Sequence, residues 1–140
     1  MNKFNYPKLE RVDTEIGRHY RDSNNNLVPS VTTVLSGTSD NKDGIEKWRK
    51  RVGENEADRI MKQSTEIGTA VHEAIEKFLG NNDWDHFQDT SDQIMARKMT
   101  SKFVDLGLNK ISQVWGLEVG LILDNLYAGC LLYTSPSPRD

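Results

Sequence analysis

The residues of this chain best suited to chemistry are His72 and Glu76, which stand four positions apart. On a helix this spacing puts both side chains on one face. An imidazole and a carboxylate so placed can hold a divalent cation together, or Glu76 can orient His72 while His72 binds the cation. Gly68, one turn earlier, leaves room for another backbone or a phosphate. The alternative interpretation is a histidine at the edge of the core beside solvated glutamates.

Glu118 is a second candidate, because it is the acidic residue of the otherwise uncharged run 114–123. Strict alternation along a strand puts Glu118 on the same side as Gly116 and Gly120, with leucine and valine side chains on the other side. One interpretation is a metal ligand beside which the two glycines clear space. The other is an ordinary glutamate that faces solvent.

A third feature is a cluster of basic residues around Trp48 that consists of Lys42, Lys47, Arg49, Lys50 and Arg51. Cations next to an aromatic ring are typical of proteins that bind single-stranded nucleic acid, because they neutralise phosphates while the ring stacks on a base. Trp48 also has helical spacing from Ile45 and Val52, so the alternative is a core tryptophan on a helix with a solvated charged face.

Hydrophobic spacing and turn signals indicate the elements that position these residues. A hairpin of short strands is expected around the turn Asn24–Asn26, followed by a short helix that Ser30 caps and Ser36-Gly37 ends. Further helices are expected at about 43–52, 57–79 and 91–106. Gly68 lies inside the second of these, so this stretch is either two helices or one long helix with a close contact at that point.

The last part of the chain has the pattern of antiparallel strands. Residues 113–123 predict a strand, Asp124–Asn125 a tight turn, and 126–129 the start of the partner strand. Helices followed by the first strands of an antiparallel sheet indicate an α+β fold. We also expect an unpaired edge strand and an uncovered apolar face around Val119, Leu121 and Leu123.

The composition fits one soluble domain. The chain has 140 residues, a net charge of −3 and 36% hydrophobic residues. It contains no apolar run of the roughly 20 residues that span a bilayer, and no apolar segment at its N-terminus that would direct secretion. We therefore predict a cytoplasmic protein without a membrane partner. Any contact with nucleic acid has to use a local basic patch.

Residues 130–140 read as a foreign tail. This stretch is identical to the translation of a transposon-type sequencing adapter, and it contains the one cysteine, Cys130. We therefore expect the native sequence to end near Gly129, so that 1–129 is the N-terminal part of a single domain and 130–140 is non-native. The native part then has no cysteine for a disulfide or a thiolate zinc site.

Taken in order, four stretches resemble the RecB-like branch of the PD-(D/E)XK nucleases, and phage-type exonucleases in particular. They are Pro29–Leu35, Ile45–Arg51, Gly68–His72 with Glu76, and Glu118 followed by Leu126–Gly129. The resemblance spans about residues 6–129. It implies the first helices and antiparallel strands of a restriction-endonuclease-like α/β nuclease core.

The resemblance also implies a site. His72 and Glu118 would be catalytic metal-site residues for Mg²⁺ or Mn²⁺, with Glu76 and Gly68 in supporting positions. The family has a metal-binding aspartate where this chain has Leu132, and then an acidic-x-Lys strand that this chain lacks. The partner would be DNA, at single-stranded ends beneath an arch of the early helices. The candidate DNA contacts are Ser30, Thr32, Trp48, Arg49 and Arg51.

Three functions are open on the sequence alone. The first is a fragment of a metal-dependent DNA exonuclease from a bacterial or phage-infected cell, inactive by itself. The second is a non-catalytic helical module that binds DNA through the Trp48 helix. The third is a helical interaction domain without a nucleic acid role.

Overall fold

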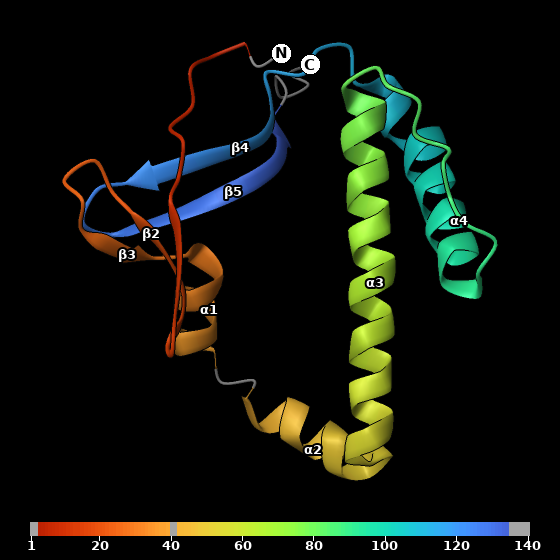
Figure 1. Cartoon of the computed structure of the whole chain (residues 1–140), viewed down its shortest axis with the longest axis horizontal. Helices are drawn as coiled ribbons and strands as arrows, with labels where there is room; N and C mark the ends of the chain where they lie inside the picture. Colours follow the sequence, from red (N-terminus) through yellow and green to blue (C-terminus); the bar gives the residue numbers. More distant parts are fainter. Residues whose placement is uncertain (1–2, 40–41, 135–140) are drawn as a thin grey trace.

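The computed structural model describes residues 3–39 and 42–134, and the chain folds into helices and antiparallel strands (Figure 1). In chain order the elements are β1 (Arg11–Thr14), β2 (Gly17–Arg21), β3 (Leu27–Pro29), α1 (Val31–Thr38), α2 (Lys42–Val52), α3 (Glu54–Leu79), α4 (Ser91–Leu106), the 3₁₀ turn η1 (Leu108–Lys110), β4 (Gly116–Leu123) and β5 (Tyr127–Thr134). All strand pairs within the two sheets are antiparallel. The α+β class expected from the sequence is confirmed.

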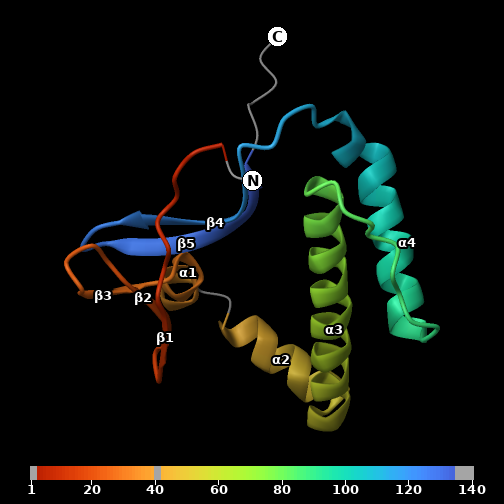
Figure 2. The same cartoon turned by 45° about the horizontal axis from the view of Figure 1, so that its top comes forward.

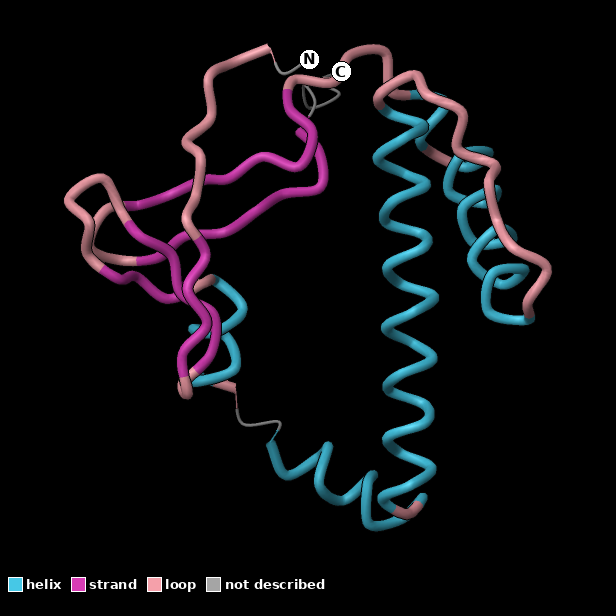
Figure 3. Tube along the Cα trace, viewed as in Figure 1, coloured by secondary structure: helices cyan, strands magenta, loops and turns pink. Residues whose placement is uncertain are grey.

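The strands gather on one side of the molecule together with α1, while α2, α3 and α4 form the other side (Figure 3). β1, β2 and β3 form one sheet, β4 and β5 form another, and a parallel bridge between Ser30 and Ala128 connects the two. α4 packs along the side of α3 that faces away from the sheets, as two views show (Figures 1 and 2). Of the helices in 3–39 and 42–134, none has the length and apolar character that crossing a bilayer requires.

The helices agree well with the predicted ranges. Ser30 caps α1 as expected, because its hydroxyl accepts the backbone N–H of Thr33 at 3.0 Å. α3 is one continuous helix through Gly68 and ends at Gly80. The close contact expected at Gly68 is wrong, since among residues 3–39 and 42–134 nothing beyond the adjoining turns of α3 lies within 4 Å of where its side chain would begin.

The predicted hairpin is confirmed as β2 and β3 around the Asn24–Asn26 turn. The sequence did not predict β1, which pairs with β2 and adds a third strand. The strand expected at 113–123 starts three residues later, at Gly116. β5 continues through Thr134, so it includes the first five residues of the expected foreign tail. The rest of that tail, residues 135–140, lies outside the described residues.

The turns of the two sheets are joined by the buried carboxylate of Asp22. It accepts backbone N–H groups of Asn24 at 2.9 Å and Asn26 at 2.8 Å within its own turn. It also accepts the N–H of Asn125, in the β4–β5 turn, at 3.1 Å. Burial raises the pKa of Asp22, but the hydrogen bonds from Asn26, Asn125 and Asn24 outweigh it and hold that pKa below its ordinary value.

This carboxylate makes stability depend on pH. Because its folded-state pKa is lowered, its contribution is present above the unfolded pKa of about 3.9 and is lost as pH falls through the lower folded value. We expect the urea midpoint to fall as the solution is acidified below about pH 4, and Asp22→Asn to weaken that dependence. Urea titrations at a series of pH values measure this, with exposed Asp13→Asn as the control. An unchanged pH profile in Asp22→Asn would contradict the assignment.

The core has two parts. One lies between α3, α4 and η1, where Val71, Ile75, Ala96 and Leu108 are buried. The other lies where β2 and β3 meet β5, around Tyr20, Val28 and Ala128. Leu132 of β5 packs against the first cluster, so the β4–β5 sheet is attached to the helices at this strand.

The N-terminal segment covers β4, which corrects two expectations. The space beside the glycines of β4 is not free for a metal, because the Tyr6 ring lies against Gly116, and Leu9 and the Pro7 carbonyl lie against Gly120. Val119 is buried, so the prediction of an uncovered face is wrong for this residue. Two other residues of that face, Leu121 and Leu123, are exposed as expected.

Candidate functional site

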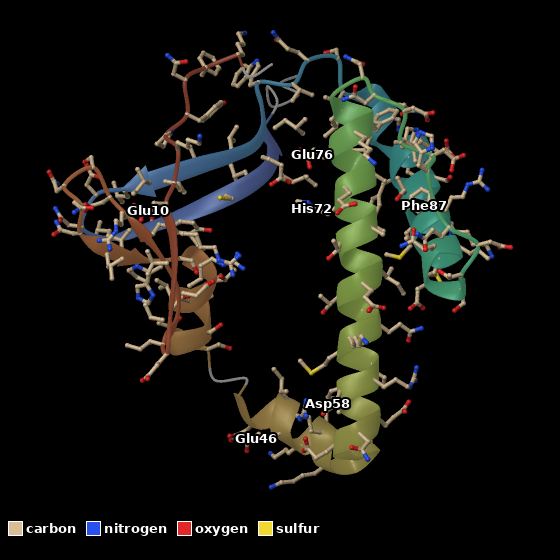
Figure 4. The ribbon with its side chains drawn as sticks, viewed as in Figure 1. Glu10, Glu46, Asp58, His72, Glu76 and Phe87 are labelled. Atoms are coloured by element: carbon tan, nitrogen blue, oxygen red, sulfur yellow. The ribbon has the colours of Figure 1, made fainter. Side chains whose placement is uncertain are left out.

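The structure brings His72 and Glu118 together. Nδ1 of His72 on α3 lies 3.1 Å from Oε1 of Glu118 on β4, and the two side chains are 51% and 37% exposed. In Figure 4, His72 and Glu76 are labelled in the half of α3 that lies beside the ends of β4 and β5. The pair is therefore open to solvent and to a ligand at the junction of α3 and the β4–β5 sheet.

The backbone of Glu118 explains how its carboxylate reaches His72. Its φ is +51°, a left-handed conformation that is uncommon for a glutamate and unusual within a strand. The alternation of β4 breaks here: a side chain at Gly116 would meet Val119, three positions along, which a regular strand puts on the opposite face. Uncommon backbone conformations of this kind cluster at functional sites.

We expect two substitutions at Glu118 to reveal this strain. Both Glu118→Gly and Glu118→Ala remove the carboxylate, but only glycine adopts a positive φ without cost. The glycine variant should therefore be more stable by about 1 kcal/mol. Urea denaturation measures the difference. The same two substitutions at Leu121 serve as the control, and there alanine should be the more stable. If the alanine variant is the more stable one at both positions, the backbone at Glu118 is unstrained.

The contact with Glu118 leaves the His72 imidazole two ways to take part in binding a metal. With the ring proton on Nδ1, His72 donates to Glu118, and Nε2 keeps the lone pair that a metal binds. Alternatively, a cation takes the place of that proton and is bound by both side chains. Glu76 lies one turn further on α3 and is half-buried. No group of three or more such side chains in 3–39 and 42–134 is arranged to hold a metal, so the pair is at most part of a metal site.

The sheet register adds a position that lies next to the pair. Leu117 pairs with Tyr133 and Val119 pairs with Leu131, so Leu132 stands opposite Glu118. Leu132 also packs against the core cluster around Val71, the neighbour of His72. The resemblance stated from the sequence predicts a metal-binding aspartate at this position. The residue here is Leu132, which contributes packing.

The predicted DNA contacts on α2 lie near the opposite end of α3. Along α3, Asp58 and His72 are separated by a rise of about 21 Å. Figure 4 shows Glu46 and Asp58 at this end, far from His72. Trp48 is half-buried, whereas Lys47, Lys50 and Arg51 are exposed.

Arg49 has a structural role that the sequence did not reveal. Its guanidinium bonds the carboxylates of Glu54, at 2.9 and 2.5 Å, and Asp58, at 2.5 Å. Hydrogen bonds to Glu54 and Asp58 raise the pKa of Arg49 above its ordinary value, so it stays charged. Arg49 thus ties α2 to the first turns of α3.

Two other predicted contacts surround the start of α1. Ser30 is buried, and its hydroxyl bonds the hydroxyls of Thr32 at 2.9 Å and Thr33 at 2.8 Å. Thr32 is exposed. Both line a pocket of about 410 Å³, together with Arg18 and the exposed face of β4 and β5. The role of this pocket in binding DNA stays a prediction.

The five candidate DNA contacts thus fall into two groups. Ser30 and Thr32 lie at the start of α1, whereas Trp48, Arg49 and Arg51 lie on α2.

Comparisons with protein-family models, with curated proteins and with solved structures found no match to this chain.

Proposed function

We propose that this chain is the N-terminal part of a metal-dependent DNA exonuclease of the PD-(D/E)XK type, RecB-like branch, with a non-native tail from Cys130 onward. The observation that carries the proposal is the contact between His72 and Glu118. The sequence nominated these two residues separately, and they lie far apart in the chain, yet their side chains meet at 3.1 Å. The contact joins α3 to β4 and so puts both nominated residues in one place of the fold.

Within this proposal, each residue has a defined task. A bound metal would be held by His72 and Glu118 together, in place of the proton that now joins Nδ1 of His72 to Oε1 of Glu118. Glu76 supplies a nearby carboxylate on the same helix face. Mg²⁺ or Mn²⁺, when bound, lowers the pKa of a water molecule and offsets charge on the scissile phosphate. The nitrogen and oxygen donors of this chain suit these cations but do not complete a site.

The helices support a path for DNA in the proposal. α2 leads away from the sheets, and α3 returns to them, so exposed Lys47, Lys50 and Arg51 lie on the helix that joins the start of α3, and a rise of roughly 27 Å separates that start from His72. That rise corresponds to about eight stacked nucleotides. A single-stranded end held by α2 can therefore extend to the pair at the other end of α3.

The test is to compare this chain with an extended chain that carries the genomic sequence following the Gly129 codon. We expect the 140-residue chain to leave end-labelled single-stranded DNA intact with Mn²⁺, and the extended chain to degrade it. In the extended chain, Glu118→Gln should lower the rate by about 10- to 100-fold. Lys62→Gln, on the exposed surface of α3, is the matched control. An inactive extended chain, or an active 140-residue chain, would refute the proposal.

The second candidate function is a non-catalytic module that binds DNA. The observation that favours it is the row of exposed cations on α2. It requires salt-dependent binding of single-stranded DNA that is indifferent to Mn²⁺ and to His72→Ala. Gln substitutions at Lys47, Lys50 and Arg51 should then lower the log–log salt slope by about 2.

A further inference from the structure

The N-terminal segment, residues 3–10, is held at both ends. At its start the backbone N–H of Lys3 donates to the carbonyl of Trp115 at 2.7 Å. The Lys3 ammonium lies 5.1 Å from the centroid of the Trp115 ring, and the Phe4 ring meets the same indole edge to face, with centroids 5.6 Å apart. At its end the carbonyl of Glu10 accepts a backbone N–H of β2 at 3.1 Å. The path between these ends is therefore fixed relative to β4.

Between its ends the N-terminal segment, red in Figures 1 and 2, passes over one face of β4. A methyl group added at Gly116 would stand 2.8 Å from the Tyr6 ring, and one added at Gly120 would stand 2.6 Å from Leu9. In a regular strand, Glu118 lies between these glycines and its side chain points to the same face. The N-terminal segment therefore occupies the space into which a regular β4 would direct the Glu118 carboxylate.

The observed conformation of Glu118 avoids that space. Its φ is +51°, and its carboxylate meets Nδ1 of His72 on α3 at 3.1 Å. Two causes could hold this backbone, exclusion by the N-terminal segment or attraction by the imidazole. Both side chains of the pair are solvent-exposed, and a pair so exposed contributes less than a left-handed backbone costs a glutamate. Exclusion from the covered face of β4 is therefore the stronger cause.

We propose that the N-terminal segment positions Glu118 for its contact with His72, with Tyr6 and Leu9 as the positioning residues. They fill one face of β4 and leave the carboxylate the side toward α3. Both act through Glu118. The importance of this positioning for catalysis rests on the proposed function, whereas the positioning itself does not.

The test combines Tyr6→Ala with Leu9→Ala in the full 140-residue chain, which we call the double variant. Nitrogen-15 NMR locates the ring proton of His72 at about pH 8, above the ordinary pKa of histidine. His72→Gln identifies its signals among those of the three histidines. In the unmodified chain we expect the proton on Nδ1, because Glu118 accepts it. In the double variant most of it should move to Nε2, as in Glu118→Ala.

Two controls separate positioning from a general loss of stability. Ala96→Gly removes packing between α3 and α4 and should leave the proton on Nδ1. Tyr6→Phe keeps the ring against Gly116 and should behave like the unmodified chain. If the double variant does not fold, Phe4→Ala replaces it, because Phe4 is 49% exposed and its loss only loosens the anchor at Trp115. It should shift part of the signal to Nε2.

A second measurement works without the contact to His72. Glu118→Gly and Glu118→Ala both lack the carboxylate, so the imidazole attracts neither side chain. Glycine should nevertheless give the higher urea midpoint in the unmodified chain, because the N-terminal segment still enforces a positive φ. In the double variant this advantage of glycine should disappear.

Three results would overturn the proposal. They are a proton that stays on Nδ1 in the double variant and in Phe4→Ala, an equal shift to Nε2 in Ala96→Gly, and an advantage of glycine at position 118 that is unchanged in the double variant. These measurements use neither metal nor DNA. An inactive extended chain would therefore refute the proposed function and leave the positioning intact, whereas an unmoved His72 proton would refute the positioning alone.

Discussion

Replacing Leu132 with aspartate is expected to raise the affinity of this chain for Mn²⁺ by about 100-fold, or about 2.7 kcal/mol. The physical reason is the register of β4 and β5, which puts position 132 opposite Glu118 and next to the α3 turn that carries His72. A carboxylate there joins an imidazole and a carboxylate that already lie 3.1 Å apart. Affinity for hard cations rises with the number and charge of oxygen ligands. Electron paramagnetic resonance of free Mn²⁺ measures the change directly.

Leu132 also packs against the core, so the same substitution is expected to cost about 2–4 kcal/mol of folding free energy. Leu132→Asn separates the two effects, because it loses the same packing without adding a charge. Leu131→Asp puts the carboxylate one residue away, where the side chain is exposed. Neither control should bind Mn²⁺ more tightly than the unmodified chain. His72→Ala should abolish the gain in the Leu132→Asp background.

If Leu132→Asp is only partly folded, thermal unfolding with and without Mn²⁺ tests the same prediction. A metal that binds the folded state alone raises the melting temperature with its concentration. Mn²⁺ should therefore stabilise Leu132→Asp and leave Leu132→Asn unchanged. Equal responses of these two variants would show that the three positions do not form a metal site, and the proposed function would lose its main structural support.

Gly120→Ala is expected to destabilise the fold by about 1–3 kcal/mol, because the added methyl group has no space. It would stand 2.6 Å from Cγ of Leu9 and 3.2 Å from the backbone oxygen of Pro7. The N-terminal segment must then move off β4 and uncover it. Urea denaturation measures the loss, and limited proteolysis should show faster cleavage before residue 10.

The matched control is Gly68→Ala, at a glycine beside which the described residues outside the adjoining turns of α3 leave the space within 4 Å open. There the substitution should stabilise the chain by about 0.5–1 kcal/mol, because alanine favours the helix. Leu9→Ala should recover part of the stability of Gly120→Ala, since it removes the atoms that clash. Additive losses in the double variant would show that the N-terminal segment does not pack on Gly120.

The helices of this protein were predictable because their signals are local. The ranges of α2 and α4 follow from hydrophobic spacing within a few turns, and the start of α1 follows from the capping hydroxyl of Ser30. The β2–β3 hairpin is equally local, since three asparagines mark its turn. In each case the residues that determine the element are close neighbours in the chain.

The remaining features depend on residues far apart in the chain. Nothing in the sequence near Gly116 and Gly120 shows that Tyr6 and Leu9 fill the space beside them. The positive φ of Glu118 is likewise invisible, because an alternating pattern predicts regular extended backbone. Arg49 resembles any other cation of a basic run, yet its partners lie on the next helix.

The candidate site was predictable only in part. His72 was nominated by its spacing from Glu76, and Glu118 by its place in an uncharged strand, but their contact needed the structure. The place of Leu132 opposite Glu118 follows from the register of β4 and β5. The roles of these positions in metal binding and of α2 in DNA binding stay predictions.

The first thirty residues contact the β4–β5 hairpin and the residue before it, and this affects the order of folding during synthesis on the ribosome. Lys3 bonds the carbonyl of Trp115, Ser23 bonds Asp124, and Ser30 bridges to Ala128. The β1–β3 sheet therefore cannot complete these contacts until residues up to Ala128 have emerged, at about 5–20 residues per second. During those seconds α3 and α4 can already associate, so the order of maturation is helices first and the early strands last.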